Sequence, residues 1–69
     1  MVFALTAKET DILAFIYGYI GDNGYPPTRQ EIAGKFSITK QGANYFIIKL
    51  ISKKKLKINR NKWRNIEII

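Results

Sequence analysis

Residues 24–33 read Gly-Tyr-Pro-Pro-Thr-Arg-Gln-Glu-Ile-Ala, and this stretch decides how the chain divides into helices. Each of its two prolines fixes its own φ and disfavours a helical residue before it, so together they predict a rigid extended connector. Thr28 and Glu31 follow with the spacing of a capping box, in which each side chain binds the backbone N–H of the other residue. The stretch therefore predicts the end of one helix and the start of a short second helix over residues 29–35.

A first helix is predicted before this connector. Thr6 and Glu9 have the spacing of another capping box. The apolar residues that follow recur as on one face of an amphipathic helix, at Ile12, Leu13, Ile16, Tyr19 and Ile20. Asn23 or Gly24 can adopt the left-handed conformation that ends a helix. The first helix is therefore predicted over residues 7–21.

A third helix is predicted over residues 40–53. Ser37 and Ile38 predict a tight turn before it, and Thr39 is expected to be its N-cap. One face of this helix is apolar and would pack inward, through Ala43, Phe46, Ile47, Leu50 and Ile51. The opposite face is mostly polar and carries Lys40, Gln41, Asn44, Tyr45 and Lys49, with Ile48 beside them.

The last segment changes from the period of a helix to the alternation of a strand. Residues 56–58 and 64–68 alternate between apolar and polar side chains, and polar residues 59–62 between them predict a turn. We expect an antiparallel hairpin whose apolar face covers the helices, because an isolated hairpin is only marginally stable. That face comprises Leu56, Ile58, Ile66 and Ile68. Three helices and a two-stranded wing make a winged helix-turn-helix fold, mainly α, in one domain over residues 1–69.

Composition excludes several classes of site. Cysteine and histidine are absent, so disulfides, thiolate metal sites and the commonest general base are excluded. Ser37 and Ser52 have no recognisable base, and we expect no enzyme activity, no cofactor and no small-molecule ligand. No apolar run approaches the roughly 18 residues of a membrane span, and the N-terminus lacks the order of a signal peptide. A cytoplasmic protein without a membrane partner is therefore expected.

The charge of +7 is unevenly distributed along the chain. Residues 1–34 hold two basic and four acidic residues, a net charge of −2. Residues 35–69 hold ten basic residues and one acidic residue, a net charge of +9. Such polarity favours a partner that is a polyanion, and nucleic acid is the leading candidate.

The fold indicates which residues would meet double-stranded DNA. The second helix of a helix-turn-helix enters the major groove, and its N-terminal residues reach base edges. Gln and Asn can each pair bidentately with adenine, and a Thr methyl can contact that of thymine. The predicted base contacts are Thr39, Gln41, Gly42, Asn44 and Tyr45. The wing, residues 59–64, is placed on the backbone or in the minor groove. The predicted phosphate and wing contacts are Thr28, Arg29, Lys40, Lys49, Arg60, Lys62 and Arg64.

Other interpretations concern the aromatic and basic residues near the C-terminus. Trp63 is expected to pack on the core or its rim, with a stacking platform as the alternative. The run 53–55 is interpreted as a solvated helix end. An exposed patch of Tyr45, Ile48 and Trp63 would instead suit a protein-interaction module without DNA binding. Structured RNA is a third possible partner, because a basic face alone does not choose between duplexes.

The chain resembles the N-terminal DNA-binding domain of the LexA repressor family. The resemblance covers nearly the whole chain and is carried by residues 5–7, the stretch 23–33, Leu50, Lys53 and the closing strand. It implies a bacterial or phage repressor that binds a palindromic operator as a homodimer. Asn44 and Tyr45 stand where the family typically has acidic residues, and the chain is one residue shorter around 37–40.

The resemblance does not extend to the family's second domain, which carries a Ser-Lys self-cleavage site and the main dimer contact. We therefore expect an excised domain or a small stand-alone regulator that does not cleave itself.

Overall fold

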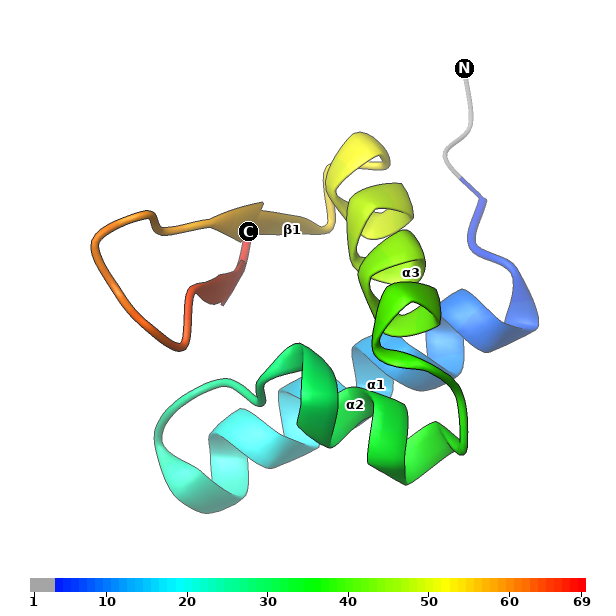
Figure 1. The fold of residues 1–69 in the computed structure, drawn as a ribbon. Helices are drawn as coiled ribbons and strands as arrows, with labels where there is room; N and C mark the ends of the chain where they lie inside the picture. Colours follow the sequence, from blue (N-terminus) through cyan, green and yellow to red (C-terminus); the bar gives the residue numbers. More distant parts are fainter. Residues whose placement is uncertain (1–3) are drawn as a thin grey trace.

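The structure, a computed structural model, describes residues 4–69 and contains three helices followed by a two-stranded hairpin (Figure 1). The elements are α1 (Ala7–Asn23), α2 (Arg29–Phe36), α3 (Lys40–Ser52), β1 (Leu56–Ile58) and β2 (Ile66–Ile68). The predicted winged helix-turn-helix fold is confirmed. The predicted helix ends differ by at most two residues: α1 and α2 run further than expected, and α3 ends one residue earlier.

Threonine caps begin all three helices. The Thr6 hydroxyl accepts the Glu9 N–H at 3.2 Å, and the Glu9 carboxylate accepts the Thr6 N–H at 3.0 Å. The same reciprocal pair joins Thr28 and Glu31, at 3.1 and 2.8 Å. Thr39 accepts the N–H of Gly42 at 3.0 Å. Both predicted capping boxes and the predicted cap of α3 are therefore present.

The core is formed by the apolar faces predicted for the first and third helices and the hairpin, together with Ile32 and Ala33 of α2. Its buried members are Ile12, Ile16, Ile32, Ala33, Ala43, Ile47, Leu50, Leu56 and Ile66. In the hairpin, Leu56 pairs with Ile68 and Ile58 with Ile66, so all four apolar side chains share one face. No helix among residues 4–69 is long and apolar enough to cross a membrane.

A buried ion pair joins the start of α1 to the end of α3. Glu9 is only 3% exposed, and its carboxylate binds the Lys53 ammonium as well as the Thr6 N–H. Lys53 also donates to the Ala4 carbonyl at 3.0 Å. The hydrogen bond from Lys53, with that from Thr6, lowers the pKa of the Glu9 carboxyl. The expectation of a solvated basic run at 53–55 is therefore wrong for Lys53, because the Glu9 carboxylate binds its ammonium group directly.

The chain reverses after α3 through a left-handed residue. Lys54 has φ 66°, and the next N–H, that of Lys55, donates to the Leu50 carbonyl at 2.9 Å. A side chain costs free energy in this conformation, which only glycine adopts readily. This turn connects the end of α3 to the start of β1.

Replacing Lys54 with glycine is expected to stabilise the domain by roughly 0.5–1 kcal/mol, because the left-handed conformation no longer strains a Cβ. The thermal unfolding midpoint should rise by a few degrees. Lys55→Gly is the matched control, because Lys55 is also exposed but is not at positive φ. It should be neutral or destabilising, and an equal gain in both variants would contradict strain at Lys54.

Candidate nucleic-acid interface

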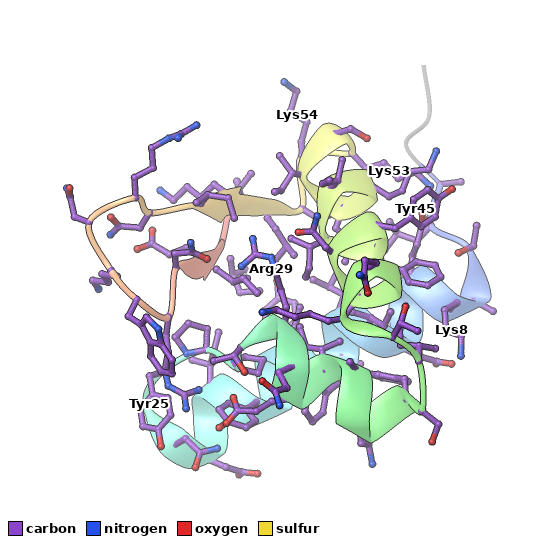
Figure 2. The ribbon with its side chains drawn as sticks, in the orientation of Figure 1. Lys8, Tyr25, Arg29, Tyr45, Lys53 and Lys54 are labelled. Carbon is purple, nitrogen blue, oxygen red and sulfur yellow. The ribbon has the colours of Figure 1, made fainter. Side chains whose placement is uncertain are left out.

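The outer face of α3, formed by Gln41, Asn44, Tyr45 and Ile48, is turned away from the core. Tyr45 and Ile48 are 55% and 56% exposed, Gln41 is exposed and Asn44 is half-buried. The Tyr45 ring lies on the outside of α3 (Figure 2), edge-on to Phe46, and the Lys49 ammonium is 5.6 Å from its centroid. Three of the predicted base-contacting residues are thus together on one accessible surface.

Thr39 and Gly42, also predicted to contact bases, serve the start of α3. A Cβ added at Gly42 would lie 3.3 Å from the Thr39 hydroxyl oxygen, closer than ordinary van der Waals contact. The missing side chain therefore makes room for the cap. Thr28 has the equivalent role at the start of α2. The cap oxygens of both threonines are engaged within the protein, and the Thr39 side chain stays at the surface.

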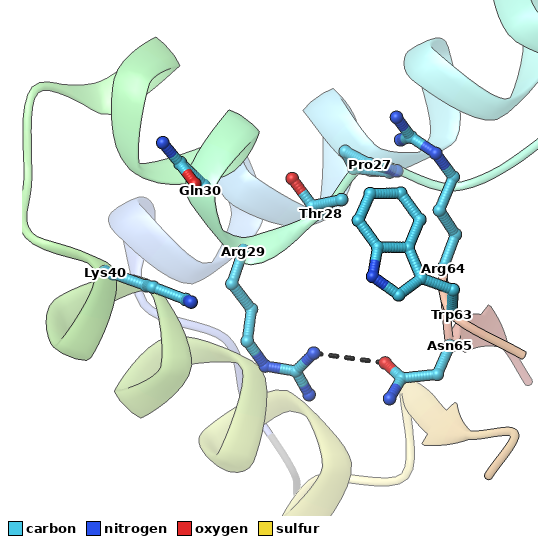
Figure 3. A pocket seen from close by; sticks show the side chains of 8 residues that line it. All are labelled: Pro27, Thr28, Arg29, Gln30, Lys40, Trp63, Arg64 and Asn65. Carbon is cyan, nitrogen blue, oxygen red and sulfur yellow. Dashed lines mark hydrogen bonds between the residues drawn. The ribbon is translucent and has the colours of Figure 1, made fainter.

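Arg29 joins the start of α2 to α3 and to the wing. Its Nε donates to Asn44 Oδ1 at 2.8 Å, and its Nη1 donates to Asn65 Oδ1 at 3.1 Å (Figure 3). Arg29 is half-buried by this arrangement. Its two donations hold the Asn44 amide in place and attach the second arm of the hairpin to the helix-turn-helix pair.

Arg64 is engaged within the protein. Its guanidinium binds the Glu31 carboxylate through two bonds, at 2.7 and 3.1 Å, and donates to the Pro26 carbonyl at 3.0 Å. It also lies 4.5 Å from the Tyr25 ring centroid. The bonds from Arg64, with that from the Thr28 N–H, lower the pKa of Glu31 to about 2. The predicted phosphate contact by Arg64 is not supported by this geometry, because its guanidinium is bound within the protein. Arg64 instead anchors the wing to the start of α2.

The tip of the wing is solvent-exposed and basic, with Arg60 and Lys62 both exposed. Trp63 is 82% exposed, so the expectation that it packs on the core or rim is wrong. The physical reason is that Trp63 precedes β2, which begins only at Ile66, and lies an odd number of residues from the buried Ile66, so neither the strand nor its alternation turns the indole inward. The Arg64 guanidinium lies 5.3 Å from its ring.

Two hollows lie on this surface, one beside the wing and one at the start of α3. A cleft of about 280 Å³ separates the wing from the helix pair (Figure 3) and is lined by Pro27, Thr28, Arg29, Gln30, Lys40, Trp63, Arg64 and Asn65. A second hollow of about 290 Å³, here called the recess, opens at the start of α3 and is lined by Arg29, Lys40, Gln41 and Asn44. Among the described residues, no group of acidic side chains could hold a metal ion.

The sequence does not predict Asn65 as a functional residue, whereas it predicts Ile48 and Trp63 only as members of an exposed patch, with a stacking role as the alternative for Trp63. Asn65 binds Arg29 across 36 positions of sequence, and no local pattern signals such a pair. Ile48 and Trp63 are large apolar side chains on the surface. The helical period already places Ile48 on the outer face of α3, seven residues after Gln41.

Comparisons with known proteins point to one family. The family model described as LexA DNA binding domain matches residues 3–65. The LexA repressor of Leptospira interrogans is 47% identical over 66 residues, covering 94% of this chain and 32% of that protein. The LexA repressor of Thermotoga neapolitana is 47% identical over 49 residues, covering 71% and 25%. The LexA repressor of Thermosipho melanesiensis is 37% identical over 65 residues. The chain thus spans about a third of the length of these relatives or less.

The lowered pKa of Glu31 predicts acid lability. Its ionised form is favoured by folding, so its contribution is complete above about pH 4.5 and is lost as the pH falls towards 2. Glu31→Gln should reduce stability at pH 7 by about 1 kcal/mol, the upper end for partly exposed ion pairs. The unfolding midpoint should then fall less between pH 5 and pH 2 than in the unmodified protein.

Asp11→Asn is the control, because Asp11 is exposed on α1. Its midpoint should follow that of the unmodified protein across the same pH range. A pH profile for Glu31→Gln as steep as that of the unmodified protein would show that Arg64 and Glu31 do not couple folding to ionisation.

Proposed function

This chain belongs to the LexA DNA binding domain family, and on that basis we propose that it recognises specific operator sequences in double-stranded DNA as part of a LexA-like repressor. The observation that carries the proposal is the family match over residues 3–65. The relatives that match are called LexA repressors, which supports repression as the outcome of binding. The proposal treats residues 1–69 as one non-enzymatic DNA-binding unit.

In the proposed complex, α3 lies in the major groove with its outer face towards the bases. Gln41 and Tyr45 are exposed there and carry hydrogen-bonding groups, and Ile48 offers an apolar contact to a thymine methyl. Thr39 and Gly42 bring the start of the helix close to the DNA. Phosphate contacts are assigned to the exposed cations around this face and on the wing tip: Lys40, Lys49, Arg60 and Lys62. Arg29 is half-buried by its bonds to Asn44 and Asn65, so it is assigned the role of holding these two residues. Thr28, the residue before Arg29, completes the proposed phosphate contacts.

Trp63 is assigned to the wing contact and Arg64 is not. An indole that is 82% exposed beside a basic tip can pack on deoxyribose or enter the minor groove. Arg64 instead holds the wing against the start of α2. A palindromic operator and a homodimer assembled on it complete the proposal, because paired half-sites place two recognition helices in successive major grooves.

A protein-interaction module is the second candidate. It is favoured by the exposure of Tyr45, Ile48 and Trp63, which are large apolar side chains. Lys40 and Lys49 lie beside that surface on α3, however, and suit phosphates better than an apolar partner. Retention of duplex DNA at physiological salt separates the two candidates.

Selection of bound duplexes from a random library tests specificity. The expected product is a palindrome whose half-sites lie about one helical turn apart. Gln41→Ala should then weaken binding to the selected operator by roughly 5- to 150-fold, because a base contact is worth about 1–3 kcal/mol. Gln30→Ala, on the neighbouring helix, is the control and should leave the ratio of operator to random-duplex affinity unchanged. Failure to enrich any sequence would refute operator recognition.

Salt dependence tests the wing. Replacing Arg60 or Lys62 with glutamine should flatten the plot of log affinity against log salt by about 0.9 for each phosphate that the variant no longer neutralises. Trp63→Ala should lower affinity without changing that slope, since the indole carries no charge. Lys8→Gln, on the far side of the helices from the wing (Figure 2), is the control and should change neither. If all three wing variants bind DNA as the unmodified protein does, the wing is not part of the interface.

A further inference from the structure

Asn44 differs from its neighbours on the outer face of α3 because its amide is held by another side chain. The Nε–H of Arg29 can only donate, so the Asn44 atom 2.8 Å away must be the carbonyl oxygen. The amide NH₂ of Asn44 is consequently turned away from Arg29. Arg29 is itself held by Asn65 of the wing, so the orientation of the Asn44 amide is set from two elements.

The recess beside Asn44 is lined mainly by hydrogen-bond donors. Lys40 contributes an ammonium group, Arg29 contributes the N–H groups that Asn44 and Asn65 do not occupy, and Asn44 contributes its NH₂. Gln41 is the fourth lining residue and can present either its carbonyl or its NH₂. A group that enters the recess therefore meets donors on most sides and is favoured when it carries acceptors.

The bases differ in how well they meet this requirement. In the major groove guanine presents two adjacent acceptors, N7 and O6, whereas adenine presents one acceptor and one donor. Bidentate pairing of asparagine with adenine needs the amide oxygen to accept from the adenine N6 amino group. In Asn44 that oxygen already accepts from Arg29, so the adenine N6 amino group would have to share the oxygen through its second lone pair. This arrangement makes the adenine pairing expected for Asn44 from sequence alone less favourable than pairing with guanine, which asks the amide only to donate.

We propose that the recess recognises guanine, with the Asn44 NH₂ donating to its N7, the O6 facing the remaining donors of the recess, and Arg29 acting as the positioning residue. The proposal rests on the proposed function, since it requires α3 to lie in the major groove. It also gives Asn65 a role, because the wing holds Arg29 and thereby the orientation of the base-contacting amide. A DNA phosphate is the other source of acceptor oxygens, and the experiment separates the two.

The first arm uses the selected operator. Selection with Asn44→Asp identifies the base pair that this side chain contacts, as the position where the preferred base changes. The unmodified protein should prefer guanine at that position. Replacing that guanine by 7-deazaguanine, which lacks the N7 acceptor, should weaken binding roughly five- to tenfold. The same replacement at a guanine outside the half-sites is the control and should have no effect.

The second arm changes the donors while keeping the hydrogen bond to Arg29. Asn44→Asp can still accept from the Arg29 Nε–H, so its unfolding midpoint should be retained, but it has no NH₂. Its preference should move from guanine towards cytosine, whose amino group donates to a carboxylate. Arg29→Lys keeps the positive charge but cannot form the two-point link to Asn44 and Asn65, so its discrimination between guanine and adenine should fall.

The contrary outcomes are distinct. Adenine at the Asn44 position, or equal affinity for guanine and 7-deazaguanine, would overturn the proposal. If Asn44→Asp and Arg29→Lys instead lose affinity equally for the operator and for random duplex, the recess holds a phosphate. Full discrimination in Arg29→Lys would show that Arg29 acts only through its charge. Absence of any selected operator would refute the proposed function itself, independently of the recess.

Discussion

The Glu31 carboxylate is the group on which the arrangement of helices and wing depends. One of its oxygens accepts the Thr28 N–H and so closes the capping box that begins α2. Both of its oxygens bind Arg64, which lies in the loop leading to β2. The start of α2 and the seat of the wing are therefore stabilised by the same ionised group. Its pKa of about 2 reflects how strongly these donors favour the charged form.

Arg29 adds a second link beside the first. It lies two residues before Glu31 and binds Asn65, the residue after Arg64. Two consecutive residues of the wing are thus attached to the first turn of α2, and Arg29 extends the connection to Asn44 in α3. These bonds fix the position of the wing relative to the outer face of α3. Two rigidly related surfaces suit a duplex, which presents its grooves and phosphates at regular positions.

The uneven charge of the chain has two causes. Part of it stabilises the fold, because the buried or half-buried carboxylates of the acidic N-terminal half are bound by cations from the basic C-terminal half. Glu9 binds Lys53, and Glu31 binds Arg64. The remaining basic residues include exposed ones around α3 and the wing tip, such as Lys40 and Arg60. Only this second group is available to a polyanion, so the number of basic residues overstates the number of phosphate contacts.

The sequence by itself determined the helices, their caps and the hairpin, because these depend on residues three or four apart or on simple alternation. Threonine–glutamate spacing located the helix starts, and apolar periodicity located the core faces. Only the tertiary structure decided which charged and polar side chains bind one another within the protein and which remain available to a partner. Arg64 and Glu31 are 33 residues apart, and Lys53 and Glu9 are 44 apart. Pairs this distant leave no local pattern, because their meeting depends on the angles at which the elements pack.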